Sequence, residues 1–486
     1  MTKIDFGGIE ETVITRDEFP LEKAQKVLKN EVIAVLGYGS QGPGQSLNLR
    51  DNGFNVIVGQ RKLDNGKVSN SYQKALDDGW IPGETLFDIN EAAKKATIIE
   101  FLLSDAGQKV AWPQLEKCIE DGNTLYFSHG FSLNFPQYTR VTPPANIDVV
   151  LVAPKGAGRS VRTNFLNGGG INSSFAVHQD YTGSALEKTL ALGIGIGSGF
   201  LFETTVRNEV VSDLTGERAV LLGELWALAE ASYDALRQQG YSPEDAFIQS
   251  SEQITQVILP LIGRSGSVEI YEQTISAKQY GSVSDHQRIT REVTRPLMEQ
   301  LYRSVVSGIE TQRSLEANSR NGYRDQLNSE LSVIDNSEMW LTGEKIRAGG
   351  GDRTYGLKIT NFPLAGAVLG IMESQYQTFI DHGHKPSEAF NETVEEATQS
   401  LNQFYQLRGA AHLLRVCSTT AQRGSLDWGP VFKKFLSPIF RDLSLYGKFI
   451  CSPPDKLIDY TLTNPNMWVV GQEVRKLRPE NQRIAA

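Results

Sequence analysis

Residues 32–42 read VIAVLGYGSQG, a β-branched run that leads directly into a glycine-rich turn, and a helical stretch follows at Gln45–Asn52. Glycines permit a tight turn and a close approach of the backbone, while the helix N-terminus offers unpaired N–H groups and a positive dipole end. This context predicts a strand, turn and helix that bind the pyrophosphate of a dinucleotide at Gly37, Gly39 and Gly42. The alternative is a chance glycine turn.

The next predicted strand, Asn55–Gly59, should end where the adenosine ribose of a dinucleotide lies. NAD sites usually carry Asp or Glu there, but residues 60–62 of this chain read QRK, and Ser69 and Ser71 follow. Cations and hydroxyls suit a 2′-phosphate that an acid would repel, so we expect NADPH rather than NADH. The alternative is a solvated basic turn.

Polar residues follow each of the further strands predicted at α/β intervals, which are Thr97–Leu103, Thr124–Phe127 and Val149–Val152. In parallel sheets, ligands bind beyond the carboxyl ends of the strands, so these polar residues should line one crevice. They are Ser104, Asp105, Gln108, Ser128, His129 and Lys155. A lone histidine or lysine is often structural or solvated, but this placement makes His129 and Lys155 candidates for catalysis.

Beyond Arg207 the pattern changes to long helical runs that contain an internal repeat at an offset of 143 residues. Residues 233–247 (YDALRQQGYSPEDAF) align without a gap with residues 376–390 (YQTFIDHGHKPSEAF). A single duplication predicts two similar lobes that pack together, because an open array needs more repeats. We therefore expect a Rossmann-type α/β domain over residues 1–205, then helical lobes over residues 206–348 and 349–486.

Each copy of the repeat keeps one pair of carboxylates, four residues apart and so on one helix face, where the other copy has neutral residues. The retained pairs are Asp213 with Glu217 and Glu392 with Glu396; their counterparts are Gly356, Thr360, Gln249 and Gln253. If the copies pack about a pseudo-twofold axis, one site holds all four carboxylates and its mate holds none.

Four carboxylates balance the charge of two divalent cations, and oxygen ligands suit Mg²⁺ or Mn²⁺ better than zinc. Glu209 lies on the same stripe as Asp213 and Glu217 and could replace either. The alternative for each pair taken alone is a solvated acidic face.

The composition is that of an ordinary globular protein, and 486 residues favour about two to three domains. A net charge of -9 without a basic stripe argues against a nucleic-acid partner. The longest apolar stretch, near Ala191–Phe202, is too short to span a membrane. Cys118, Cys417 and Cys451 cannot form a disulfide framework, and the acidic N-terminus shows no signal or transit pattern. A reducing cytoplasm fits these features, although an organellar protein without its transit peptide would look the same.

These motifs together resemble the ketol-acid reductoisomerases, or acetohydroxyacid isomeroreductases, in their long, plant-like class II form. The landmarks are GYGSQGPGQ at 37–45, SHGF at 128–131, APKGAG at 153–158, GINSSFAVHQD at 170–180, SDLTGER at 212–218, NETVEEA at 391–397 and CSTTAQRG at 417–424. Only the part before Glu31 shows no family motif. The resemblance implies a Rossmann-type domain followed by a knotted, all-α region, and a homo-oligomer. It also implies Mg²⁺-dependent isomerisation and NADPH reduction of 2-acetolactate or 2-aceto-2-hydroxybutyrate in valine, leucine and isoleucine biosynthesis.

The resemblance also implies roles for single residues. Two Mg²⁺ ions would be held by Asp213, Glu217, Glu392 and Glu396, and Ser418 would hold the substrate carboxylate. His129 and Lys155 fall on active-site positions, and Glu396 could relay the proton, as could a metal-bound hydroxide. The residues implied for NADPH are Tyr38, Gly39, Ser40, Gln41, Arg61, Ser69, Ser71, Asp105, Gln108 and Gly158.

Two other functions are compatible with parts of the pattern. A metal-free NADP-dependent 3-hydroxyacid dehydrogenase also joins a Rossmann domain to helices and uses a lysine, but it has no use for four carboxylates. A non-catalytic NADPH-binding regulator would use the helical lobes only as a platform for dimerisation.

Overall fold

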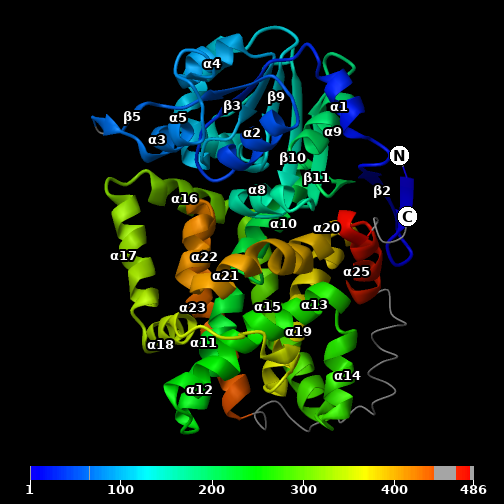
Figure 1. The fold of residues 1–486 in the computed structure, drawn as a ribbon, viewed down its shortest axis with the longest axis vertical. Coiled ribbons are helices and arrows are strands. Elements are labelled where there is room, and N and C mark those ends of the chain that lie inside the picture. The colour runs from blue at the N-terminus through cyan, green and yellow to red at the C-terminus, as the bar shows by residue number, and fades with distance from the viewer. Residues whose placement is uncertain (1, 65, 443–466, 482–486) are drawn as a thin grey trace. The chain divides into compact units, whose positions relative to one another are not determined.

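The computed structural model describes residues 2–64, 66–442 and 467–481, and it divides the chain into two compact units (Figure 1). The first unit contains Glu10–Val210 with Met1–Ile4 and Arg475–Ala486, and the second contains Val211–Val474 with Asp5–Ile9. The predicted division of the helical region near residue 348 stays a prediction. Cys451 lies outside the described residues, and no helix within them is long and apolar enough to cross a membrane.

A ten-stranded sheet forms the centre of the first unit (Figure 1). Six neighbouring strands are parallel, in the order β10-β9-β8-β3-β4-β7. Their bounds are β3 Ile33–Leu36, β4 Val56–Gly59, β7 Leu86–Phe87, β8 Ile98–Phe101, β9 Thr124–Phe127 and β10 Asp148–Pro154. All six are buried along their length, as parallel strands covered on both faces are. The parallel strands predicted from the sequence are confirmed, and their carboxyl ends share one edge.

Four further strands extend the sheet beyond β10, in the order β11, β12, β2 and β1. β11 (Ser173–Gln179) runs antiparallel to β10, and β2 (Glu10–Thr15) runs antiparallel to β12 (Phe200–Glu203). β1 (Thr2–Asp5) is the edge. The sequence did not predict these strands. For β2, the reason is that its pairing partner β12 lies far along the chain.

Helices cover both faces of the sheet, and each face has its own apolar core. On one face, side chains of α1 (Leu21–Val27), α2 (Gly42–Asp51) and α9 (Ala185–Gly195) join the core. On the other face α4 (Ile89–Lys95) and α5 (Asp105–Leu115) do so. The remaining helices are α3 Asn70–Asp77, η1 Glu116–Cys118, α6 Phe131–Asn134, α7 Pro136–Thr139 and α8 Gly158–Leu166; a hairpin of β5 (Leu63–Asp64) and β6 (Lys67–Val68) precedes α3.

One carboxyl group lies unpaired in this sheet: Glu100, in β8, is fully buried, and neither of its carboxyl oxygens has a hydrogen-bond partner among the described residues. Burial raises its pKa from 4.5 to about 8, so the folded protein keeps this proton at neutral pH. The unfolded chain releases the proton above its ordinary value. Stability is therefore lost as the pH rises from 4.5 to about 8, by about 1.4 kcal/mol for each pH unit.

Glu100→Gln should remove this cost, since glutamine keeps the shape of the protonated acid. We expect the variant to be more stable than the wild type at pH 7.5, with the difference vanishing near pH 4.5. Urea unfolding at both pH values measures this. A difference that does not change with pH would show that Glu100 is not the titrating group.

The second unit is helical, and the 143-residue offset recurs in its elements (Figure 1). The elements of the first copy are α10 Val206–Arg218, α11 Gly223–Gln238, α12 Pro243–Phe247, η2 Ile248–Ile258, α13 Leu259–Ser265, α14 Val268–Ser276, α15 Tyr280–Val306, α16 Ile309–Asn318, α17 Tyr323–Asp335 and α18 Glu338–Ala348. Those that follow are η3 Tyr355–Leu357, α19 Phe362–Asp381, α20 Pro386–Phe390, η4 Asn391–Leu401, α21 Asn402–Arg408, α22 Ala410–Val416, α23 Thr419–Arg441 and α25 Met467–Lys476.

Each copy contains a π-helix, and long helices of one copy pack against long helices of the other. η2 and η4 are both π-helices of 11 residues, and such helices are rare and often lie at functional sites. The first long helix of each copy packs against the last long helix of the other, α11 on α23 and α19 on α15. The copies are therefore interlocked. The knot implied by the family resemblance stays a prediction.

Candidate functional site

The glycine turn after β3 is a place where main chains meet closely. Gly37 has a φ of +104°, which side-chain-bearing residues rarely adopt, and a Cβ there would lie 2.9 Å from the Leu102 carbonyl oxygen. A Cβ on Gly158, the first residue of α8, would lie 1.9 Å from the Ser40 carbonyl oxygen. The turn and the APKGAG segment can touch only because both are glycine-rich.

The polar side chains of the turn are engaged within the protein. The Tyr38 hydroxyl donates to Asp78 (2.8 Å) and accepts from the Trp80 indole (2.9 Å), so the ring lies in the core and its hydroxyl is engaged within the protein. The Gln41 side chain donates to the Gly156 carbonyl at 3.0 Å. These bonds fix the turn at the carboxyl edge of β3.

The segment after β4 supplies the cations expected at a 2′-phosphate. Arg61 and Lys62 are exposed, and Gln60, at the position where an acid would hold a ribose, accepts a hydrogen bond from the Tyr38 amide at 2.8 Å. The Ser69 hydroxyl caps α3 by accepting from the Tyr72 amide, and it also donates to the Arg61 carbonyl at 3.0 Å. Ser69 thus holds the Arg61 loop against α3.

Of the residues after β8, Ser104 caps helix α5 and Gln108 bonds to the main chain at the end of β8. Ser104 caps α5 by accepting from the Gly107 amide, and Asp105, partly exposed, opens that helix. The Gln108 side chain is buried and donates to the carbonyls of Phe101 (2.7 Å) and Leu103 (3.2 Å). Gln108 therefore shapes the end of β8.

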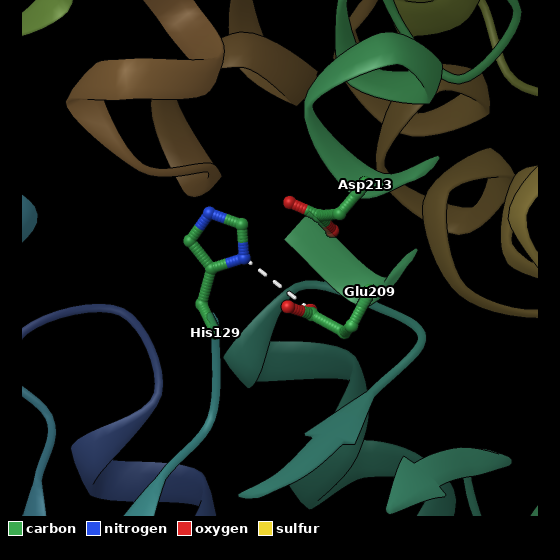
Figure 2. Close-up of side chains that lie close together, drawn as sticks. All are labelled: His129, Glu209 and Asp213. Carbon is green, nitrogen blue, oxygen red and sulfur yellow. Dashed lines mark hydrogen bonds and ion pairs between the residues drawn. The ribbon is translucent and has the colours of Figure 1, made fainter. Parts of the chain in front are cut away.

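A buried charge centre joins the ends of β9 and β10 to α10, and Figure 2 shows two of its residues, His129 and Glu209. The Glu209 carboxylate accepts from the Gly130 amide at 2.7 Å and lies 3.3 Å from His129 Nδ1 and 3.5 Å from Lys155 Nζ. Lys155 and Glu209 are almost completely buried, whereas a quarter of the His129 side chain is exposed. The structure thus brings His129 and Lys155 together through Glu209.

The charge of Glu209 is held by its neighbours. Burial raises the pKa of the carboxyl group, but the charges of His129 and Lys155, with the hydrogen bonds from His129 and Gly130, outweigh burial and lower it below its usual value. Glu209 stays ionised at neutral pH and compensates the buried ammonium of Lys155. The only signal for Glu209 in the sequence was its position on the same helical stripe as Asp213 and Glu217.

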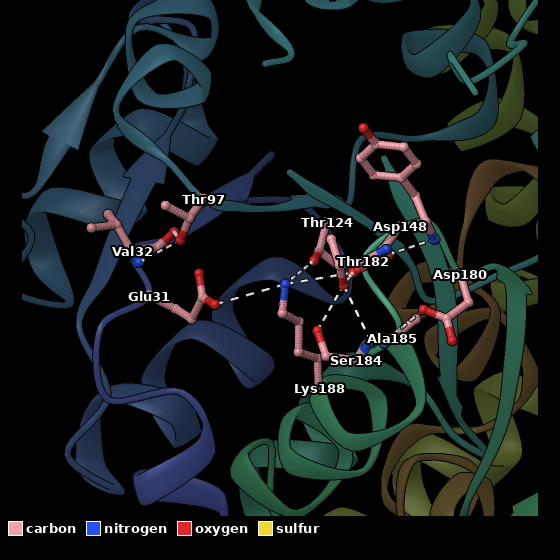
Figure 3. A network of polar contacts seen from close by, with 11 residues as sticks. Glu31, Val32, Thr97, Thr124, Asp148, Asp180, Thr182, Ser184, Ala185 and Lys188 are labelled. Carbon is pink, nitrogen blue, oxygen red and sulfur yellow. Dashed lines mark hydrogen bonds and ion pairs between the residues drawn. The ribbon is translucent and has the colours of Figure 1, made fainter. Parts of the chain in front are cut away.

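A second lysine and carboxylate, partly buried Lys188 and buried Asp148, lie at the opposite, amino edge of the sheet (Figure 3). Asp148, at the start of β10, accepts from the amides of Tyr181 and Thr182, both at 2.9 Å, and lies 3.5 Å from Lys188 Nζ. Lys188 also lies 3.8 Å from Glu31. Ligands of such sheets bind at the carboxyl edge, so this network is structural.

The acidic residues of the two copies meet in the second unit. One carboxylate oxygen each of Asp213, Glu392 and Glu396 lies within 4.8 Å of the others, a spacing that fits a shared divalent cation. Asp213 comes from α10, and the two glutamates come from the π-helix η4. Three of the four predicted metal ligands therefore form one cluster.

The fourth carboxylate, Glu217, faces the same place. Burial, followed by the charges of Glu217, Glu396 and Asp213, raises the pKa of the Cys417 thiol well above its ordinary value. Next to Cys417, the Ser418 hydroxyl caps α23 by accepting from the Ala421 amide at 3.0 Å. A helix N-terminus attracts anions, so Ser418 lies where a substrate carboxylate would be stabilised.

The SDLTGER motif contains two residues that position its carboxylates. A Cβ on Gly216 would lie 3.2 Å from the Glu392 carbonyl oxygen, so the glycine lets α10 approach η4. The buried Arg218 donates to Glu310 of α16 at 3.0 Å and lies against Gly424, where a Cβ would clash with the guanidinium at 2.6 Å. The sequence analysis missed these roles, since no pattern links Arg218 to Glu310.

At the positions of the repeat that correspond to the acidic cluster, neutral residues are joined by hydrogen bonds. The Thr360 hydroxyl donates to Gln249 Oε1 and the Thr360 amide donates to Gln253 Oε1, both at 2.9 Å. The Asn361 side chain adds a bond to the Gln249 carbonyl at 2.7 Å. These hydrogen bonds involve only uncharged groups, and this part of the second copy forms no counterpart to α10.

Family comparisons decide what these parts belong to. Residues 27–200 match the acetohydroxy acid isomeroreductase NADPH-binding domain, and residues 206–349 and 362–445 match the ketol-acid reductoisomerase C-terminal domain. The chain belongs to the ketol-acid reductoisomerase family. The unmatched residues 350–361 fall on the stretch that corresponds to α10 at the 143-residue offset.

Relatives within the ketol-acid reductoisomerases differ in length, and two of them are described by their use of NAD. The NAD(+) enzyme of Desulfosudis oleivorans is 52% identical over 348 residues, 72% of this chain and 97% of its own. The chloroplastic enzyme of Spinacia oleracea is 35% identical over 453 residues, 90% of this chain and 74% of its own. An NADH-preferring ketol-acid reductoisomerase from an uncultured archean superposes with a TM-score of 0.63 at 28% identity, over 70% of this chain and all of its own. Assignment to the plant-like class stays a prediction.

Proposed function

We propose that this ketol-acid reductoisomerase converts 2-acetolactate or 2-aceto-2-hydroxybutyrate into a 2,3-dihydroxy-3-methyl acid with two Mg²⁺ ions and NADPH. Isomeroreduction in branched-chain amino acid biosynthesis is the activity of the family to which both matched regions belong. The observation that carries the metal-dependent part is the meeting of Asp213, Glu392 and Glu396 within 4.8 Å. Four carboxylates, Glu217 included, fit two divalent cations in charge and in ligand type.

The nicotinamide cofactor fits the carboxyl edge of the parallel strands. The glycine turn and the N-terminus of α2 suit a pyrophosphate, and α5 and α8 begin at the same edge. We propose NADPH because the position after β4 holds Gln60, and Arg61 and Lys62 follow it. The proposed cofactor residues are Gly37, Tyr38, Gly39, Ser40, Gln41, Gly42, Arg61, Ser69, Ser71, Asp105, Gln108 and Gly158.

The reaction assigns a task to each group of side chains. The four carboxylates would hold Mg²⁺, which would supply Lewis-acid activation of the substrate hydroxyl and ketone for the alkyl migration. Ser418 and the N-terminus of α23 hold the substrate carboxylate. Glu396 takes the hydroxyl proton. Lys155, kept charged by Glu209 and accompanied by His129, would stabilise negative charge on the substrate oxygen, and the bound cofactor would supply the hydride.

The test is NADPH oxidation in the presence of 2-acetolactate, with and without Mg²⁺, on protein first treated with EDTA. We expect no turnover without Mg²⁺ and full recovery on its addition. Full activity after chelation would exclude the two-metal mechanism and favour a metal-free hydroxyacid dehydrogenase. Cofactor binding without turnover under any condition would favour a regulator.

Arg61→Glu tests the cofactor preference. The substitution places an acid near the proposed 2′-phosphate, so NADPH binding should weaken by about 1–3 kcal/mol while NADH binding changes little. Fluorescence titration with both cofactors measures this, and Lys94→Glu, a charge reversal at an exposed lysine of α4, is the matched control. Equal weakening for both cofactors would show that Arg61 does not contact the phosphate.

Two further expectations complete the proposal. We expect a homo-oligomer, a dimer or larger, and no nucleic-acid or membrane partner. A reducing compartment fits the cysteines of the described residues, Cys118 and Cys417, neither of which is in a disulfide. The cytoplasm is the proposed location, or a plastid or mitochondrion for an imported protein; relatives from both organelles exist.

A further inference from the structure

A line of buried polar side chains leads from α15 to the acidic cluster. The Tyr302 hydroxyl lies 2.9 Å from His384 Nε2, and His384 Nδ1 lies 3.2 Å from Glu388. The Ser212 hydroxyl lies 3.4 Å from Glu388 Oε1 and 3.4 Å from Glu392 Oε1. All five side chains are buried, and the line ends on a proposed metal ligand.

The chemistry of these groups determines which of them donates and which accepts each hydrogen bond. A carboxylate only accepts hydrogen bonds, so His384 donates from Nδ1 to Glu388, and a neutral ring then accepts the Tyr302 proton at Nε2. Ser212 has a single proton and faces two carboxylates at equal distance. Glu388 and Glu392 therefore compete for one donor.

We propose that Glu388, held by His384 and Tyr302, is a positioning residue that draws the Ser212 hydroxyl away from Glu392 and so frees Glu392 to bind a divalent cation. This inference rests on the proposed metal site. A cation bound to Glu392 would withdraw electron density from its carboxylate and weaken it as an acceptor, so Ser212 would then donate to Glu388. The charge-assisted bond to Glu388 then stabilises the loaded form.

The duplication supports a specific role for this line, because the first copy has no equivalent. At the 143-residue offset, His384 and Glu388 correspond to Tyr241 and Asp245, which are exposed. Asp245 there takes part in the N-cap of α12, where its amide donates to the Ser242 hydroxyl at 3.0 Å. The His384–Glu388 part of the line is thus present only in the copy that carries Glu392, and Tyr302 and Ser212 of the other copy complete the line.

The experiment is calorimetric titration of Mn²⁺ into the full chain without substrate or cofactor. Glu388→Gln keeps the shape but weakens the acceptor, and it should raise the dissociation constant about tenfold, the low end for loss of an outer partner. Ser212→Ala removes the contested donor, so Glu388→Gln in that background should change the constant less than twofold. His382→Asn, which alters a ring stacked on Tyr302 outside the line, should leave the constant unchanged.

The outcomes separate the inference from the proposed function. An equal loss on Glu388→Gln in both backgrounds would overturn the inference, because Glu388 would then act through its charge and not through Ser212. Tyr302→Phe removes only a hydroxyl and should weaken Mn²⁺ about threefold; no change in Tyr302→Phe and in Glu388→Gln would overturn the inference as well. Absence of Mn²⁺ binding by the wild type would overturn the metal site itself.

Discussion

Asp213→Asn is expected to lower turnover of 2-acetolactate by at least about a thousandfold, because the proposed metal ligands would contribute several kcal/mol of charge stabilisation. Asp213 belongs to the cluster with Glu392 and Glu396, and asparagine keeps its size while removing its charge. The dissociation constant of NADPH should stay within a few fold, since no residue of the glycine turn changes. Steady-state turnover and fluorescence titration of NADPH measure the two effects.

The matched control is Asp234→Asn, which makes the same chemical change on α11, where the carboxylate lies 2.9 Å from Lys433 and is partly exposed. That variant should retain wild-type turnover, since exposed ion pairs contribute little. If Asp213→Asn weakened NADPH binding as strongly as it lowered turnover, metal and cofactor binding would not be separate functions of the chain.

Glu209→Gln is expected to lower turnover about a hundredfold or more and to destabilise the protein by about 3 kcal/mol, because the buried ammonium of Lys155 loses its counter-charge. The pKa of Glu209 is lowered in the folded protein, so its carboxylate stabilises the fold above about pH 4.5, and this contribution is lost as the pH falls below that value. The variant should lose that part of the acid sensitivity. Turnover and urea unfolding between pH 7 and pH 3.5 test both effects.

Asp148→Asn is the control for Glu209→Gln, since it also neutralises a buried carboxylate beside a lysine, at the other edge of the sheet. It should cost similar stability while the folded enzyme keeps its turnover. If both variants lost turnover equally, the effect of Glu209→Gln would be one of stability, and a catalytic role of the Glu209 centre would be wrong.

The parts that the sequence predicts are those whose physical cause is local. The glycine turn at residues 37–42 follows from backbone sterics, and the parallel strands follow from apolar runs placed between helices. The meeting of Asp213 with Glu392 and Glu396 is not local, yet the repeat predicts it, because each copy keeps the carboxylates that the other lacks.

The parts that the sequence does not predict depend on contacts between distant residues. Nothing near Glu209 indicates that its carboxylate accepts from Gly130 and faces Lys155. The strand β2 needs β12 as its partner, and the buried pair of Arg218 and Glu310 joins α10 to α16 across 92 positions of the chain. In a single sequence, nothing distinguishes these residues from other charged or apolar residues.

The packing of long helices of one copy against those of the other affects how the protein folds. Since α11 covers α23 and α19 covers α15, the apolar faces of either copy are buried only when the other copy is in place. Helical stability in proteins comes chiefly from such packing. The two copies therefore form one cooperative folding unit, and loss of structure in one exposes the core of the other. A substitution in the core of either copy should therefore also disturb the helices of the other, including those that carry Asp213, Glu392 and Glu396.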